Sequence, residues 1–239
     1  EAPMTAALVS CDIEHQVAAI RIDDGKVNAV SHQLIAELGQ ALDRAEQQAR
    51  AVVLVGRPGR FSGGFDLGVM TAGPEAMREL VLAGGALFLR LFTFPAPVVV
   101  ACTGHALAAG AVLLTTADHV VGAEGAFKIG LNEVSIGMPL PIFALELARH
   151  RLGPRHLAAA TLHARVHDPR AALEAGFLHE LVAPEQLEQT ALDRARALAD
   201  ALSPPAYQRT KASLRGAIAR HVEQTLAEDI AAFAISPTD

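Results

Sequence analysis

Two periods of apolar residues run along the chain. Short runs rich in β-branched residues predict strands, because such runs pack well on a pleated surface. Where apolar residues recur every three or four positions they predict helices instead. The strand-like runs are 15–22, 51–55, 97–101 and 118–122, and residues 127–129 lead into a further extended segment. The helix-like stretches between them are about 31–45, 75–92 and 108–116.

Ser31 precedes the first helical stretch, where its hydroxyl can cap the helix. The stretch 108–116 is apolar on all sides, so we expect it to be buried. Strands that alternate with helices predict an α/β fold with a parallel sheet and right-handed crossovers.

Beyond Leu140 the pattern is almost wholly helical. One helix is expected to end at Gly153-Pro154. Three further helices are expected over residues 184–202, 204–217 and 219–234. The last of these carries an apolar stripe that would otherwise lie in water: Leu226, Ile230 and Phe233. We therefore expect a core over 1–183 and a helical region over 184–239 that docks on the core or on a neighbouring subunit.

Composition narrows the class of protein. Of the 239 residues, 51% are hydrophobic but only 4% are aromatic, so Ala, Val and Leu must fill the interior. A formal charge of −6 and the absence of basic runs argue against nucleic acid as a partner. The longest apolar window, 106–117, is too short to span a bilayer. Cys11 and Cys102 are too few for a disulfide scaffold. We expect a soluble cytoplasmic protein that binds neither nucleic acid nor membrane and holds no metal.

Two glycine-rich segments follow strand-like runs. Residues 61–67 (Phe-Ser-Gly-Gly-Phe-Asp-Leu) come after 51–55, and residues 104–110 (Gly-His-Ala-Leu-Ala-Ala-Gly) come after 97–101. A chain that breaks at glycine and then enters a helix leaves backbone N–H groups without partners. Two such corners facing each other would form a pocket of donors for an oxygen that gains negative charge.

These corners belong to an ordered set of segments: 27–30 (Val-Asn-Ala-Val), 61–67, 104–110, 117–118 (Ala-Asp) and 130–137 (Gly-Leu-Asn-Glu-Val-Ser-Ile-Gly). In order and spacing the set resembles the crotonase superfamily, the enoyl-CoA hydratase/isomerase group, over about residues 8 to 230. The resemblance implies a spiral of ββα units, a helical C-terminal region that forms homotrimers or hexamers, and acyl-CoA thioester substrates. Coenzyme A would enter as part of the substrate, with no other cofactor.

The resemblance also implies roles for particular residues. The backbone N–H groups of Phe65 and Ala109 would form the oxyanion hole, although position 109 is often glycine in the family. The CoA portion would lie along six residues: Lys26, Val27, Ala29, Ser62, Gly64 and Asp66. Asp66 is equally suited to cap the next helix. Lys211 would either meet a CoA phosphate or lie on a solvated helix face.

The two carboxylates of the family fall at Val112 and Glu133, so the first is absent. Glu133 is retained, although Asn132 replaces the usual proline before it. Beside Val112, Ile136 and Leu140 the pKa of Glu133 should be raised, which helps it to take and return a proton. A single carboxylate favours isomerisation of a 3-enoyl-CoA to a 2-enoyl-CoA with Glu133 as the proton shuttle.

Other functions stay open at this point. Hydratase, thioester hydrolase and decarboxylase chemistry all use the same oxyanion hole in this superfamily. A non-catalytic acyl-CoA-binding subunit is the alternative of another class. The acyl chain is expected to lie against residues of 67–92, in particular Met70, Met77, Leu80 and Leu82.

Overall fold

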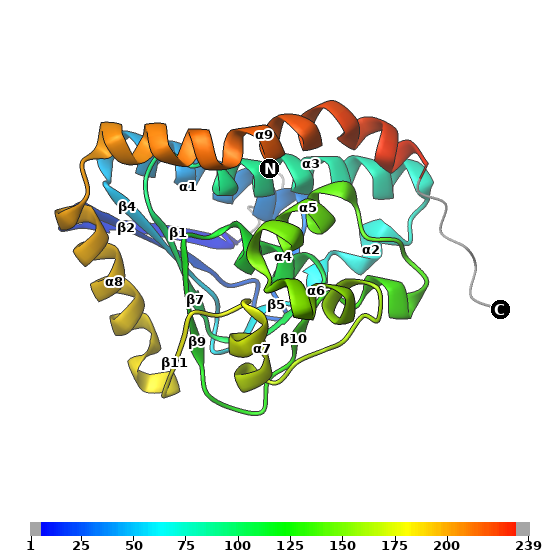
Figure 1. The fold of residues 1–239 in the computed structure, drawn as a ribbon, viewed down its shortest axis with the longest axis horizontal. Helices are drawn as coiled ribbons and strands as arrows, with labels where there is room; N and C mark the ends of the chain where they lie inside the picture. The colour runs from blue at the N-terminus through cyan, green and yellow to red at the C-terminus, as the bar shows by residue number, and fades with distance from the viewer. Residues whose placement is uncertain (1–5, 233–239) are drawn as a thin grey trace.

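A six-stranded sheet forms the centre of the computed structural model, which describes residues 6–232 (Figure 1). The strand order is β1-β2-β4-β7-β9-β11. β1 pairs with β2 in antiparallel fashion, and the other neighbours are parallel. The strands are β1 (Val9–Glu14), β2 (Val17–Ile22), β4 (Ala51–Val55), β7 (Val98–Cys102), β9 (His119–Ala123) and β11 (Glu180–Val182). The parallel sheet and its crossover helices confirm the predicted α/β class.

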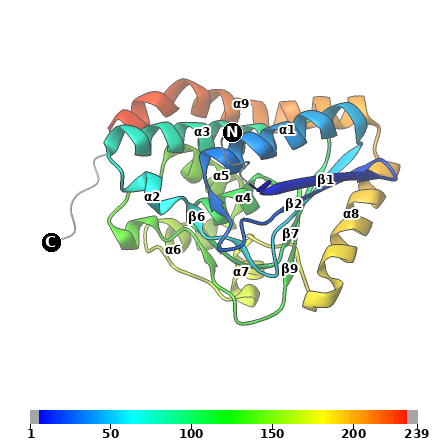
Figure 2. The ribbon, with the colours of Figure 1, turned by 180° about the vertical axis from the view of Figure 1, so that it is seen from behind.

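Helices cover both faces of this sheet. On β4, Val53 and Val55 pack with α8 (Leu187–Ala201) on one face. Val52 and Leu54 belong to the larger core on the opposite face, with α1 (His32–Gln48) and α3 (Pro74–Phe92). Because β4 is buried on both faces, it reads as a continuous apolar run rather than an alternating one. Figure 2 shows α1, α3 and α9 (Pro204–Ala231) side by side, with α8 apart from them.

Two small sheets lie beyond the carboxyl ends of β4 and β7. β5 (Gly59–Ser62) and β10 (Ile129–Gly130) flank β8 (Gly104–Leu107), and β3 (Ala29–Val30) pairs with β6 (Gly64–Phe65). Glycine is required where β5 and β8 meet, since a Cβ on Gly104 would lie 2.2 Å from the carbonyl carbon of Gly59. These strands make up most of the two glycine-rich segments.

The remaining helices are short. They are α2 (Leu67–Met70), α4 (Ala109–Thr116), α5 (Ile142–Arg151), α6 (Pro154–Thr161) and α7 (Pro169–Ala175), with 3-10 turns at Glu133–Ile136 and Pro184–Gln186. The hydroxyl of Ser31 accepts a hydrogen bond from the Leu34 N–H and caps α1, as predicted. α4 is buried along its whole length, also as predicted.

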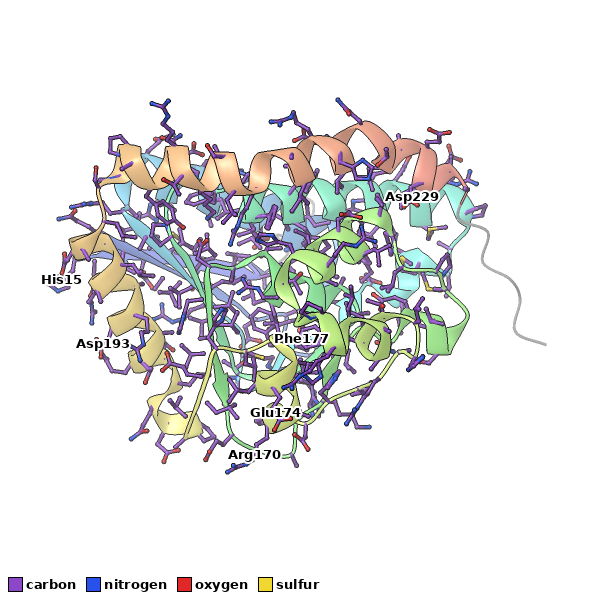
Figure 3. The ribbon with its side chains drawn as sticks, in the orientation of Figure 1. His15, Arg170, Glu174, Phe177, Asp193 and Asp229 are labelled. Carbon is purple, nitrogen blue, oxygen red and sulfur yellow. The ribbon has the colours of Figure 1, made fainter. Side chains whose placement is uncertain are left out.

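The elements predicted from the sequence pattern were wrong near both ends of the described residues. The run 15–22 is the second strand of a hairpin, and β1 was not predicted. His15 (labelled in Figure 3) and Gln16 form the tight turn with φ of 48° and 62°, although neither is glycine. The predicted helices 204–217 and 219–234 are one helix, α9. Gly216 weakens helix propensity there, but buried Arg215 and Ala219 on either side hold the helix on the core. Phe233 lies outside the described residues.

α9 docks on its own chain. It contacts α3 and α5, and Leu226 and Ile230 are buried in the main core. Asp229, near the end of α9 in Figure 3, accepts a hydrogen bond of 2.8 Å from the Ile142 N–H at the start of α5. Within residues 6–232, no helix has the length and apolarity that a membrane crossing requires.

Lys211 corrects a prediction. It lies neither on a solvated face nor within reach of a surface phosphate, because its side chain is only 5% exposed. Its Nζ lies 2.7 Å from Oδ2 of Asp118, at the start of β9. The periodicity of α9 alone did not reveal this partner, which is 93 residues away in sequence.

Candidate active site

The two glycine-rich corners face each other, as the sequence predicted. Gly64 has a φ of 103°, which favours glycine, and it packs on the start of α4. A Cβ at Gly64 would lie 3.1 Å from the Cβ of Ala108 and 3.6 Å from the backbone nitrogen of Ala109. Phe65 and Ala109 are thus on adjoining segments, although their sequence positions are far apart.

The backbone aims two N–H groups away from their own elements. Ala109 is the first residue of α4, so no carbonyl of that helix can reach its N–H. The N–H of Asp66 donates to Val30 of β3. Because successive N–H groups alternate along a strand, the N–H of Phe65 points away from β3. Both groups are therefore free of the ladder and helix bonds that would otherwise occupy them.

A cavity of about 220 Å³ adjoins both corners. Phe65, Ala109 and Glu133 all line it, so the fold brings the three predicted catalytic residues together. Its walls are mainly hydrocarbon, from side chains that include Leu67, Met70, Val81, Val112, Ile136 and Phe143. Within the described chain, Glu133 is the single ionisable residue of this lining.

Glu133 opens the 3-10 turn that follows β10, and it is only 7% exposed. Burial raises its pKa from 4.5 to about 7, because the ionised carboxylate loses solvation in this environment. Its Oε2 atom is buried and has no hydrogen-bond partner among residues 6–232. Of its three predicted neighbours, Val112 and Ile136 share the cavity lining, whereas Leu140 does not. The site thus holds a titratable carboxyl near two outward-directed N–H groups.

Comparison with known proteins decides the family. The enoyl-CoA hydratase/isomerase family model matches residues 12–237. The chain belongs to the enoyl-CoA hydratase/isomerase family. A crystal structure of an enoyl-CoA hydratase/isomerase family protein from Pseudomonas syringae superposes with a TM-score of 0.92 at 39% identity, covering 95% of this chain and 98% of that one. The architecture is therefore the crotonase fold, as the sequence motifs implied.

Relatives in the family carry different activity names. Human mitochondrial enoyl-CoA delta isomerase 1 is 30% identical over 95% of this chain and 76% of its own length. A putative enoyl-CoA hydratase from Thermus thermophilus is 33% identical over 81% of this chain and 76% of its own length. Membership of the family alone does not distinguish isomerase from hydratase.

The predicted CoA-binding residues of this family member surround the first corner rather than the cavity. Ala29 lies opposite Gly64 in the β3–β6 pair, and the carbonyl of exposed Val27 accepts a hydrogen bond from Gly63. The N–H groups of Lys26 and Ala29 already donate to the carboxylate of one residue, Asp24. This loop is thus held in shape by its own side chains.

Ser62 and Asp66 have structural partners. Ser62 is fully buried, and its hydroxyl donates to the Asn28 carbonyl at 2.7 Å. Asp66 caps α2 by accepting hydrogen bonds from the N–H groups of Gly68 and Val69. Helix capping was one of the two roles predicted for Asp66.

The prediction for the acyl pocket was partly wrong. Met70 lines the cavity, but Met77, Leu80 and Leu82 do not. On α3 the residue that faces the cavity is Val81. Since adjacent helical residues point in directions about 100° apart, Leu80 and Leu82 point away from the direction of Val81. Met77 and Leu80 are fully buried in the core instead.

Sequence reasoning missed two residues that shape the site. Asn28 is fully buried at φ 53°, and its side-chain amide donates to the carbonyls of Ile22, Arg60 and Phe61. This links the loop before β3 to the first corner. Ala108 has φ 50° and ψ −124°, a strained conformation for a residue with a Cβ. Its ψ angle sets the direction of the Ala109 N–H. Asn28 could have been singled out as the polar residue of the otherwise apolar 27–30 motif. Nothing in the sequence indicated the role of Ala108.

Proposed function

We propose that the protein is an enoyl-CoA isomerase that moves a double bond from the 3-position to the 2-position of an acyl-CoA. The observation that carries the proposal is one buried carboxyl, Glu133, in a hydrocarbon cavity beside the two corner N–H groups. Val112 stands where the family resemblance gives a second carboxylate, and it offers no group that could hold a water molecule.

The reaction moves one proton. The thioester oxygen accepts hydrogen bonds from the N–H groups of Phe65 and Ala109. The Glu133 carboxylate removes a proton from C2, and the electron pair of that C–H bond delocalises into a dienolate with negative charge on the oxygen. Glu133 then returns the proton to C4, which leaves the double bond between C2 and C3. Each N–H donor stabilises the charge more in the transition state than in the ground state and contributes about 10²–10³ in rate.

The environment of Glu133 suits this shuttle. A base whose pKa is close to the working pH is ionised often enough to take a proton and acidic enough to give it back. Burial brings the pKa of Glu133 to about 7, which meets this condition. The reaction requires no water and no cofactor beyond the CoA carried by the substrate.

The coenzyme portion of the substrate is proposed to lie along the loop 26–29 and the segment 62–66, next to the cavity. The residues proposed for it are Lys26, Val27, Ala29, Ser62, Gly64 and Asp66. The helical region from 184 onward is proposed to contribute to a homotrimer or hexamer, which sedimentation of the purified protein would test.

The test is to incubate the protein with 3-enoyl-CoA and, separately, with 2-enoyl-CoA. We expect 2-enoyl-CoA from the first and no hydration of the second. Glu133→Gln should lower turnover by about 10³-fold, since a carboxamide cannot accept the proton, and leave acyl-CoA affinity nearly unchanged. Glu124→Gln is the matched control, because Glu124 is a surface residue 55% exposed.

Other outcomes separate the alternatives. Formation of a 3-hydroxyacyl-CoA would identify a hydratase, and release of free CoA or of CO₂ would identify a hydrolase or a decarboxylase. Binding without turnover of any thioester, unaffected by Glu133→Gln, would identify a non-catalytic acyl-CoA-binding subunit.

A further inference from the structure

The side chain of Asn132 departs from the local rule for its position. It occupies the N-cap of the 3-10 turn Glu133–Ile136, where an asparagine normally accepts a hydrogen bond from an N–H of the first turn. Here it makes no capping bond. The Ser135 N–H and hydroxyl donate instead to the backbone carbonyl of Asn132. The amide side chain is thus left available for another role.

Asn132 belongs to the lining of the candidate active-site cavity. Asn132 lines the cavity next to Glu133, and its Oδ1 atom is buried without a partner in the described part of the chain. An acceptor left unpaired in such a place is destabilising. A local rule broken beside a reactive group is the pattern expected of a functional residue.

Glu133 presents the complementary problem. Its Oε2 is also buried and unpartnered in the same cavity. Two unpartnered oxygen acceptors beside hydrocarbon walls are unfavourable while Glu133 is ionised, but a protonated Glu133 carboxyl has an O–H that it can donate to the Asn132 oxygen. No other charged or titratable side chain of residues 6–232 lines the cavity: β6, α3, α4 and α5 bring Phe65, Val81, Val112 and Phe143.

We propose that Asn132 is a positioning residue for the proton shuttle, with its Oδ1 accepting a hydrogen bond from the protonated carboxyl of Glu133. Its role in turnover rests on the proposed isomerase function. The bond holds the carboxyl in one orientation while it carries the proton from C2 to C4. It also favours the neutral form of Glu133 in the protein without substrate.

The test is a titration of Glu133 that does not depend on activity. The carboxyl carbon of Glu133 is followed by ¹³C NMR in the unliganded protein, with Glu133→Gln assigning the signal. Asn132→Leu keeps a similar volume but removes the acceptor, so we expect the pKa of Glu133 to fall by about one pH unit. Met138→Leu alters another residue of the cavity lining without changing a polar group, and its titration should match the parent protein.

A pKa that is unchanged in Asn132→Leu overturns the proposal. A pKa that rises overturns it too, because the amide would then have favoured the ionised carboxylate and not the protonated carboxyl. If circular dichroism shows that the leucine variant is unfolded, Asn132→Val provides the same readout. In the active protein, the pH profile of kcat/KM should move to lower pH by the same amount as the NMR titration.

The two proposals can fail separately. A shifted titration in a protein without isomerase turnover leaves the Asn132–Glu133 bond standing and removes the proposed function. An unshifted titration in an active isomerase that depends on Glu133 does the reverse.

Discussion

At the scale of single residues, ionisation of Glu133 opposes folding. Its pKa rises from 4.5 to about 7 on burial, so between these values the folded chain holds a proton that the unfolded chain has released. The stability that this proton provides is complete below about pH 4.5 and is lost as the pH rises through 7. Above pH 7 the buried charge should destabilise the protein by about 3 kcal/mol relative to a neutral side chain.

Glu133→Gln should therefore raise the free energy of unfolding more at about pH 8.5 than at about pH 5. Urea denaturation of both proteins at the two pH values measures the difference, and comparison within each pH removes the effect of other titrating groups. Equal differences at both pH values would show that the carboxyl is not held in an apolar environment.

Residues differ in how much of their role the sequence reveals. The place of Glu133 in the cavity could be predicted, because its motif is local and ordered with the others. Lys211 could not, since its partner Asp118 is 93 residues away and only the fold brings them together. The strain at Ala108 could not be predicted either, because an alanine in the sequence gives no sign that its φ will be positive.

At the scale of elements, β6 approaches the start of α4 closely, and this approach brings Phe65 and Ala109 onto adjoining segments. Gly64→Ala would place a Cβ 3.2 Å from the carbonyl oxygen of Leu107 and 3.1 Å from the Cβ of Ala108, at a φ of 103°. One of the two segments must move, and we expect kcat/KM to fall by about 10²-fold, the loss typical of one misplaced oxyanion donor.

Gly59→Ala is the control for that substitution. Gly59 also has a positive φ, 76°, but a Cβ there meets nothing within 4 Å. It should lower stability by about 1 kcal/mol and leave kcat/KM close to that of the parent protein. An equal loss of activity in both variants would mean that backbone strain, not the contact with α4, explains the effect at Gly64.

The difference between local sequence signals and long-range packing explains which elements could be predicted. β4 was predictable because its five consecutive apolar residues indicate a strand buried on both faces. α1 was predictable because its capping residue, Ser31, directly precedes it. β1 was not predicted although its residues alternate between half-buried and exposed, because its turn at His15 and Gln16 lacks the glycine that would mark a hairpin. α9 was predicted as two helices, because helix propensity is a local property and is low at Gly216. The packing that keeps α9 continuous there involves residues far away in the sequence.

At the scale of the whole molecule, α4 joins the active site to the C-terminal helix. Its first residue, Ala109, presents an N–H to the cavity. At its other end the carbonyls of Thr116 and Ala117 accept hydrogen bonds from Arg215 of α9. The positive charge of Arg215 lies at the negative end of the helix dipole, which is the favourable arrangement. α9 thus stabilises the helix whose first residue, Ala109, lines the cavity.

The anchor of α9 is an ion cluster around Asp118. This carboxylate is 2.7 Å from Lys211 and 3.0 Å from Arg215, both less than a tenth exposed, and it also accepts from the Val98 N–H. Asp118→Asn leaves two buried cations without a counter-charge. We expect the free energy of unfolding, measured by urea denaturation, to fall by about 3 kcal/mol.

Asp43→Asn is the matched control, since Asp43 also pairs with an arginine, Arg90, but is 62% exposed. That substitution should cost less than about 1 kcal/mol, because water screens the surface pair. Equal losses in the two variants would mean that α9 is held by its apolar contacts with α3 and α5 rather than by the buried charges.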